Sequence, residues 1–304
     1  MFEPRTQNPL LAAVLILTAT AFIAGTTLLA KALGSDALGI NALGTPLHPL
    51  QISHGRFLFA CLTFLVILAV RRRRLHAPDL RLHGARTLFG WLGVSLMFAS
   101  VAHIPMADAT AITFLNPVFA MILAIPLLGE KVGPIRWSAA IAALIGAAIL
   151  LRPTPASFQP AALLALAAAV SMGIELIFMK KLSGREPILQ ILTVNNLIGI
   201  CIATLAVWPV WIAPTALQWV ALAGIGVLMA CAQTAFLNGV ARADASFVAP
   251  FSYATLVFAA AYDALMFGAR PDAVTLLGAG IILGGALVLA LRERRVHQVP
   301  PIPK

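Results

Sequence analysis

A single arginine stands in a long uncharged stretch of the chain. Arg56 lies within LHPLQISHGRFLFACLTFLVILAVRRRR, residues 47–74, and the next charges are the four arginines that begin at Arg71. If this stretch is a helix crossing an apolar layer of about 30 Å, Arg56 lies about 22 Å from the arginine run and roughly 8 Å from the opposite surface. The guanidinium then either extends to that surface, or faces a bundle interior and binds an anionic substrate group or a carboxylate.

Two acids also interrupt apolar stretches. Asp263 precedes Arg270 by seven residues, which on a helix places it at a depth similar to that of Arg56 and makes it a candidate partner. Glu175 precedes Lys180 by five residues, about 7 Å along a helix. It is either a protonatable coupling group, or part of an inner vestibule near Lys180 and Lys181.

Two histidines lie near the ends of apolar segments. His54 and His103 are candidate gate or proton-relay residues, and the alternative is a structural role at an interface. The histidines show no metal-ligand spacing, and the three cysteines lie within apolar runs without a CxxC pair. We expect no metal site, no cofactor and no catalytic residue.

Aromatic residues follow one helical face near the C-terminal end of the chain. Phe251, Phe258 and Tyr262 are spaced by seven and four residues, which places them on the same side of a helix. Such a face either contacts lipid or borders a polar cavity, and the tyrosine favours the cavity because a buried phenol needs a hydrogen-bond partner.

Prolines interrupt two apolar segments at Asn116-Pro117 and Ala249-Pro250. A proline leaves the carbonyl four residues earlier without its helical partner, here those of Thr113 and Ser246. In a membrane, that carbonyl bonds to a neighbouring side chain or borders a cavity that holds water or substrate.

The elements that position these residues are predicted to be membrane-spanning helices. Of the 304 residues, 61 % are hydrophobic and 11 % charged, and the mean hydropathy of +0.95 is too high for a soluble domain. Each segment of roughly 20 apolar residues suffices to cross a bilayer as a helix. Ten segments qualify: 9–32, 48–70, 84–103, 107–128, 134–151, 159–179, 188–211, 216–240, 245–268 and 273–291. The fold class is therefore an all-α integral membrane protein.

The basic residues orient these ten helices. With the N-terminus in the cytoplasm, all of the 21 Lys and Arg residues fall on the cytoplasmic side except Lys31, Arg56, Arg152 and Arg270. Arg86 is thereby counted with the cytoplasmic residues. Both termini are predicted to be cytoplasmic, in a bacterial inner membrane. The arginine run from Arg71 is expected to contact lipid headgroups and not nucleic acid.

The chain also contains an internal repeat. PMADATAITFLNPVFAMILAIPLLGEKV is similar to RADASFVAPFSYATLVFAAAYDALMFGARP, and LIGAAILL to LGGALVLA. Residues 1–152 and 153–304 each hold five segments, and because five is odd, the second half enters the membrane from the opposite side. Secondary transporters use inverted repeats to open a central site to one side and then the other. Small residues four apart, Ala142 with Gly146 and Gly280 with Gly284, predict close packing of the fifth and tenth helices, within the fold or as a homodimer seam.

The ten segments, the two halves and the phrases DATAITFLNPVFAMILAIPLLGEKV and DASFVAPFSYATLVF resemble the EamA-type branch of the drug/metabolite transporter superfamily. HPLQISHGRF with APFSYATLVFAA looks most similar to members that take up riboflavin or S-adenosylmethionine. The resemblance implies a substrate cavity between the central helices. Its implied lining residues are Phe98, Asn116, Gln233, Ser252 and Tyr253.

These patterns predict a secondary transporter of a small organic metabolite that works by alternating access. Aromatic rings and neutral hydrogen-bonding groups suit a planar heterocycle, with riboflavin as the specific candidate. The alternatives are an exporter of amino acids or other metabolites, a membrane scaffold and, least favoured, a lipid-modifying enzyme, because the ionisable residues are scattered singly. The expected partners are the metabolite and membrane lipid.

Overall fold

The computed structural model describes residues 7–34, 45–72, 75–101, 112–151, 162–267 and 272–298. All regular structure in these ranges is helical. The helices are α1 (Pro9–Gly34), α2 (Pro49–Val70), α3 (Leu80–Val101), α5 (Asn116–Leu128), α6 (Pro134–Leu151), α7 (Ala162–Ser183), α8 (Ile188–Val207), η2 (Trp208–Val210), α9 (Ala216–Val240), α10 (Ala245–Val248), η3 (Ala249–Tyr253), α11 (Ala254–Phe267) and α12 (Ala273–Gln298).

The helices agree with the predicted segments in position. Each of the ten predicted ranges contains a described helix, although α3 begins at Leu80, one turn before the predicted start at 84. Within the described residues, six helices are long and apolar enough to cross a membrane alone: Pro9–Gly34, Pro49–Val70, Ala162–Ser183, Ile188–Val210, Ala216–Val240 and Ala245–Met266. The protein is thus an all-helical, multi-pass membrane protein, while the number of ten spans stays a prediction.

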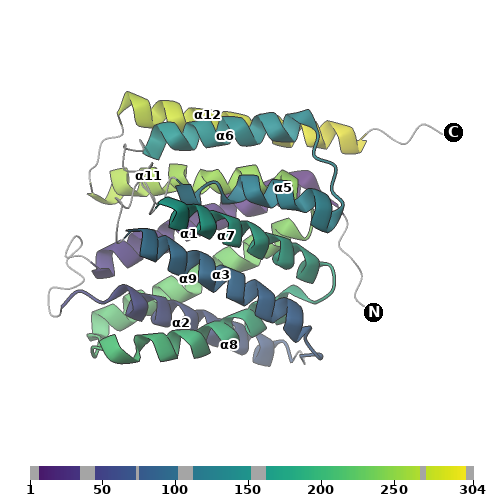
Figure 1. The fold of residues 1–304 in the computed structure, drawn as a ribbon. Coiled ribbons are helices and arrows are strands. Elements are labelled where there is room, and N and C mark those ends of the chain that lie inside the picture. The colour runs from purple at the N-terminus through teal and green to yellow at the C-terminus, as the bar shows by residue number, and fades with distance from the viewer. Residues whose placement is uncertain are drawn as a thin grey trace.

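Helices from the two predicted halves of the chain pack against one another. α1 packs against α9 and α11, α2 against α8 and α9, α7 against α3 and α5, and α6 against α12. In Figure 1, α6 and α12 lie together at one edge of the bundle, and α2 and α8 lie together at the opposite edge. The centre of the bundle is therefore bounded by helices of both halves.

Of the small residues singled out in α6 and α12, Gly146 serves contact between the two helices within one chain. A Cβ added at Gly146 would lie 2.8 Å from the Gly278 carbonyl oxygen and 2.8 Å from Ile282, so only glycine permits this approach. Gly280 and Gly284, in contrast, have open space beside them. A homodimer seam on that second face stays a prediction.

Glycine also brings α2 and α9 into close contact. A Cβ at Gly226 would lie 2.3 Å from the Phe59 Cβ and 2.9 Å from the Ala60 backbone nitrogen, and one at Gly55 would lie 2.7 Å from Leu222. Because the backbones approach this closely, α2 and α9 share a rigid interface.

The backbone differs at the two helix interruptions that Pro117 and Pro250 cause. Before Pro117 the chain makes a turn, α5 begins at Asn116, and the Asn116 side-chain amide donates to the Thr113 carbonyl at 3.0 Å. Around Pro250 the ninth segment changes from α10 to the 3-10 helix η3 and back to α11. The freed Thr113 carbonyl therefore has a side-chain partner, which is the simpler of the two predicted solutions.

The end of α5 is tied to the start of α10. The Glu130 carboxylate accepts hydrogen bonds from the backbone amides of Ala245 (2.8 Å) and Ser246 (3.0 Å) and from the Ser246 hydroxyl (2.6 Å). Asp244, the N-cap residue of α10, pairs with Arg136 at 2.9 Å and does not cap the helix with its side chain. One acid from the first half thus caps a helix of the second half.

Candidate functional site

A cavity of about 410 Å³ lies in the centre of the bundle. Its walls come from α1, α2, α3, α5 and α7, and also from α8, α9 and η3. The volume lies in the range of about 300–1,000 Å³ that is typical of small-molecule sites. Contributions from both halves of the chain make this cavity the candidate substrate site.

Among the residues that the structure describes, three ionisable side chains line this cavity. Arg56 comes from α2, Arg86 from α3 and Glu175 from α7. Arg86 is only 3 % exposed, and its Nε lies 4.0 Å from the Glu175 Oε1, which is an ion pair without a hydrogen bond. The Arg56 guanidinium lies over the Phe57 ring, 4.2 Å from its centre. Of the two interpretations of Arg56, the geometry matches the one that faces the bundle interior.

Glycine makes room for the acid in this cluster. A Cβ added at Gly90 on α3 would lie 2.8 Å from the Glu175 Cδ and 3.0 Å from each of its carboxylate oxygens. The carboxylate therefore rests directly on the backbone of α3, one turn after Arg86. This contact, and not one with Lys180, defines the surroundings of Glu175, because Lys180 donates to the Val240 and Ala243 carbonyls at the end of α9.

Three of the five residues implied by the family resemblance line the cavity: Asn116, Gln233 and Ser252. Gln233 accepts a hydrogen bond from Asn196 at 2.7 Å, which fixes its amide in the wall. Phe98 lies on α3, but its side chain falls outside what the structure describes.

Tyr253 is fully buried, and its ring packs on Phe114 with centroids 5.9 Å apart. Ser252, its neighbour in η3, lines the cavity, whereas Tyr253 is not among the lining residues. A role for Tyr253 at the substrate stays a prediction.

The remaining predicted residues lie outside the cavity wall or outside the described part of the chain. Tyr262 donates to the Ala21 carbonyl at 3.3 Å and so joins α11 to α1, and its predicted role at the substrate stays a prediction. His54 meets the Trp211 ring edge to face, with centroids 5.6 Å apart. The Asp263 side chain and all of His103 lie outside the described residues, so a contact between Arg56 and Asp263 stays a prediction.

Several lining residues were not singled out for the site from the sequence. The positive-inside pattern assigns Arg86 to the cytoplasmic side, and the sequence patterns do not indicate Thr87, Trp91 or Ser53. All four residues line the cavity. A signal was present: Arg86, Gly90 and Val94 recur at four-residue steps, so they share one face of α3. Asn195, on α8, also lines the cavity and accepts a hydrogen bond from the Thr87 hydroxyl at 3.3 Å.

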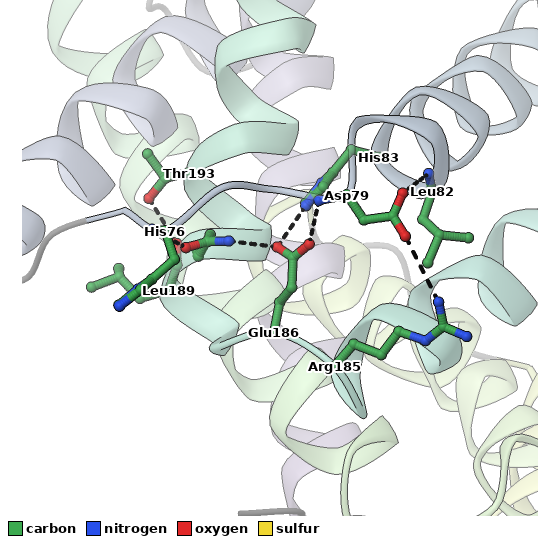
Figure 2. A network of polar contacts seen from close by, with 9 residues as sticks. His76, Asp79, Leu82, His83, Arg185, Glu186, Leu189 and Thr193 are labelled. Atoms are coloured by element: carbon green, nitrogen blue, oxygen red, sulfur yellow. Dashed lines mark hydrogen bonds and ion pairs between the residues drawn. The ribbon is translucent and has the colours of Figure 1, made fainter. Parts of the chain in front are cut away.

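A polar network holds the start of α3 against the turn between α7 and α8. The Glu186 carboxylate accepts from the Asp79 backbone amide at 2.7 Å and from Gln190 at 2.8 Å, and it contacts the His83 Nε2 at 2.9 Å. Figure 2 shows Glu186 at the centre of these contacts, with Arg185 turned outward to Asp79. Because His83 is one turn before Arg86, the network also positions the cavity arginine.

The ionised Glu186 side chain is expected to make the folding stability depend on pH. Burial opposes its ionisation, but the hydrogen bonds from His83, the Asp79 amide and Gln190 outweigh burial and lower the pKa of the carboxyl group. Because this pKa is lower in the folded than in the unfolded state, the ionised carboxylate contributes its full stabilisation at pH values above the ordinary pKa. This contribution is lost as the pH falls through the lowered pKa. We expect Glu186→Gln to reduce stability by about 1–3 kcal/mol at neutral pH, and the difference from the parent protein to shrink in acid.

The measurement is the apparent unfolding temperature of the detergent-solubilised protein at a series of pH values. Arg185→Gln is the matched control, because the neighbouring Arg185 is 64 % exposed and its 3.7 Å pair with Asp79 contributes about 0–1 kcal/mol. Equal effects of the two substitutions at neutral pH would show that the network does not stabilise this turn.

Comparison with known proteins gives a consistent picture. The model of the EamA-like transporter family matches residues 10–152 and again 159–291. A riboflavin transporter of Rhizobium johnstonii is 33 % identical over 251 residues, covering 80 % of each chain. An S-adenosylmethionine uptake transporter of Rickettsia prowazekii is 26 % identical, covering 83 % of this chain and 86 % of the relative. A pseudopaline exporter of Pseudomonas aeruginosa is 26 % identical, covering 69 % and 74 %. One crystal structure matches with a TM-score of 0.75 and 23 % identity over 93 % of this chain and 98 % of the other.

Proposed function

The chain belongs to the EamA-like transporter family, and we propose that it is a secondary transporter that carries a small organic metabolite across the bacterial inner membrane by alternating access. The observation that carries this proposal is the central cavity, whose charged and amide side chains come from helices of both halves. Ionisable groups in apolar surroundings are costly, and in membrane proteins they mark substrate or ion pathways.

The proposal includes two halves of opposite orientation, residues 1–152 and 153–304. The twofold match of the family model supports it, and so does the pairing of helices. In such a repeat, each helix of the first half corresponds to one helix of the second half. The contact between α1 and α9 then corresponds to that between α7 and α3, and the contact between α5 and α7 to that between α11 and α1. All four pairs of helices are in contact. The distribution of the basic residues supports a cytoplasmic position for both termini.

One pair of helices departs from this equivalence. α2 and α9 are in extensive contact, whereas the equivalent pair, α8 and α3, has little contact and borders the cavity. A carrier that alternates between two states closes one member of such a pair while the other is open. The asymmetry therefore fits a single state of an alternating cycle.

For the substrate we propose a planar heterocycle, with riboflavin as the specific candidate. The name of the Rhizobium relative supports it, as do the aromatic rings of Phe57 and Trp91 and the amides of Asn116, Asn195 and Gln233 around the cavity. The alternative is a metabolite exporter, and the similarity to the pseudopaline exporter favours it over a scaffold.

The test is counterflow into proteoliposomes that hold the full-length protein and unlabelled riboflavin. We expect labelled riboflavin to accumulate transiently above the level in protein-free vesicles, because exchange through one alternating site is faster than net flux. Flux of amino acids without flux of any flavin would replace riboflavin by the exporter alternative. Vesicles that exchange no member of either group would count against a transporter of small metabolites.

A further inference from the structure

Among the described residues that line the cavity, positive charge exceeds negative charge. These residues include two cations, Arg56 and Arg86, and one anion, Glu175. Glu175 forms an ion pair with Arg86 and also attracts Arg56 electrostatically, so one negative charge faces two positive charges. A site with one unbalanced positive charge in apolar surroundings is suited to a ligand that brings one negative charge.

Arg86 presents unused hydrogen-bond donors at this site. Its side chain is 97 % buried, being 3 % exposed, yet its Nε and Nη1 have no hydrogen-bond partner within the described residues. An arginine keeps its charge at any physiological pH, and buried donors of a charged group are costly when they stay unpaired. The Glu175 Oε1, with which Arg86 forms an ion pair, is 4.0 Å from Nε, too far for a hydrogen bond. These donors point to a ligand with an acceptor group.

Arg56 completes one side of the same site. Its guanidinium lies 4.2 Å from the centre of the Phe57 ring, which holds the charge in a fixed place beside an aromatic surface. Thr87 and Asn195 join α3 to α8 at 3.3 Å next to Arg86, so the arginine-bearing face of α3 is anchored to the second half. The cavity thus combines a cationic part with a part lined by aromatic rings.

We propose that the substrate of this cavity is an organic anion whose carboxylate or phosphate group is bound by Arg86 and Arg56, with its ring portion against Phe57 and Trp91. This inference rests on the proposed function, since it assumes that the cavity is the transport site, and it narrows the substrate class. Glu175 then sets the strength of anion binding, because its negative charge offsets part of the attraction of the two arginines.

The experiment measures equilibrium binding to the purified full-length protein in nanodiscs. Two matched pairs of probes share a ring and differ in charge: riboflavin 5′-phosphate with riboflavin, and nicotinate with nicotinamide. We expect the anion of at least one pair to bind about tenfold more tightly than its neutral partner, because hydrogen bonds to a charged group contribute about 1.5–3 kcal/mol. Preference in the flavin pair alone identifies a phosphate group as the ligand, and preference in the nicotinate pair alone identifies a carboxylate.

Substitutions separate this role from a structural one. Arg86→Gln is expected to weaken binding of the anion about tenfold and to leave the neutral partner within about threefold, whereas Glu175→Gln is expected to strengthen anion binding severalfold. Arg81→Gln is the control, because Arg81 lies on the same helix and is exposed. If Arg86→Gln does not fold, Arg56→Gln and Glu175→Gln decide by the same criteria.

Three results would overturn the inference: equal or tighter binding of the neutral partner in both pairs, no binding of either anion at millimolar concentration, or an anion preference that the arginine and Glu175 substitutions leave unchanged. Its failure differs from failure of the proposed function. Riboflavin counterflow without any anion preference leaves a transporter and removes the anion site. Anion preference without flux of any tested compound keeps the site and removes the transport role.

Discussion

Gly226→Ala is expected to destabilise the helix bundle by about 1–3 kcal/mol and to lower the apparent unfolding temperature in detergent by several degrees. The added Cβ would lie 2.3 Å from the Phe59 Cβ and 2.9 Å from both the Ala60 nitrogen and the Phe59 carbonyl carbon. Two of these three atoms belong to the backbone of α2, so no side-chain rotation relieves the overlap. The helices must move apart, which also loosens the contact that keeps this side of the bundle closed.

A loss of stability in Gly226→Ala would be informative, because the intrinsic helix propensity of alanine alone predicts a gain. Alanine is favoured over glycine within a helix by about 1 kcal/mol, so a glycine without close neighbours is stabilised by the same substitution. Gly224→Ala provides that control on the same helix, since its Cβ would meet only Leu29, at 3.7 Å. We expect Gly224→Ala to be neutral or slightly stabilising. Similar unfolding temperatures for the two variants would show that α2 and α9 do not depend on this close approach.

Helix positions were predictable from the sequence because each depends on a local property. Runs of apolar residues and the turn residues between them locate α1, α2 and α9 to within a few residues. Pro250 likewise predicts an interruption, and the structure has the 3-10 helix η3 there. The pairing of helices across the two halves depends on contacts between distant residues, and the sequence indicated it only through the internal repeat.

The charged site was only partly predictable. Arg56 could be predicted as a candidate because it stands alone in an uncharged stretch. Arg86 could not be distinguished from the other basic residues that follow the arginine run. Arg86 is buried about one turn after His83, whose contact with Glu186 joins segments far apart in the sequence, and no local pattern reveals such a contact. The burial of Tyr253 is similarly hard to read from the sequence, because the direction of a side chain in η3 depends on the local 3-10 geometry.

Gly90→Ala is expected to reduce riboflavin counterflow roughly tenfold or more while the protein still folds. The added Cβ would lie 2.8 Å from the Glu175 Cδ and 3.0 Å from both carboxylate oxygens. All three atoms form the far end of a flexible side chain, so the carboxylate moves at little cost to stability. Its displacement changes the distance to Arg86, now 4.0 Å, and with it the charge arrangement in the cavity. A displacement of about 1 Å in a positioned charged group is sufficient to lower rates by one to two orders of magnitude.

Gly84→Ala is the matched control for this last experiment, because it lies on the same helix and an added Cβ there would meet nothing within 4 Å. The two variants change α3 by the same methyl group and gain the same helix preference, so a difference in counterflow isolates the contact with Glu175. The unfolding temperatures of both are expected to stay within a few degrees of the parent protein. Parental transport by Gly90→Ala would mean that the position of the Glu175 carboxylate is irrelevant to the cycle. A loss of transport in both variants would show that transport depends on the flexibility of α3 and not on the contact with Glu175.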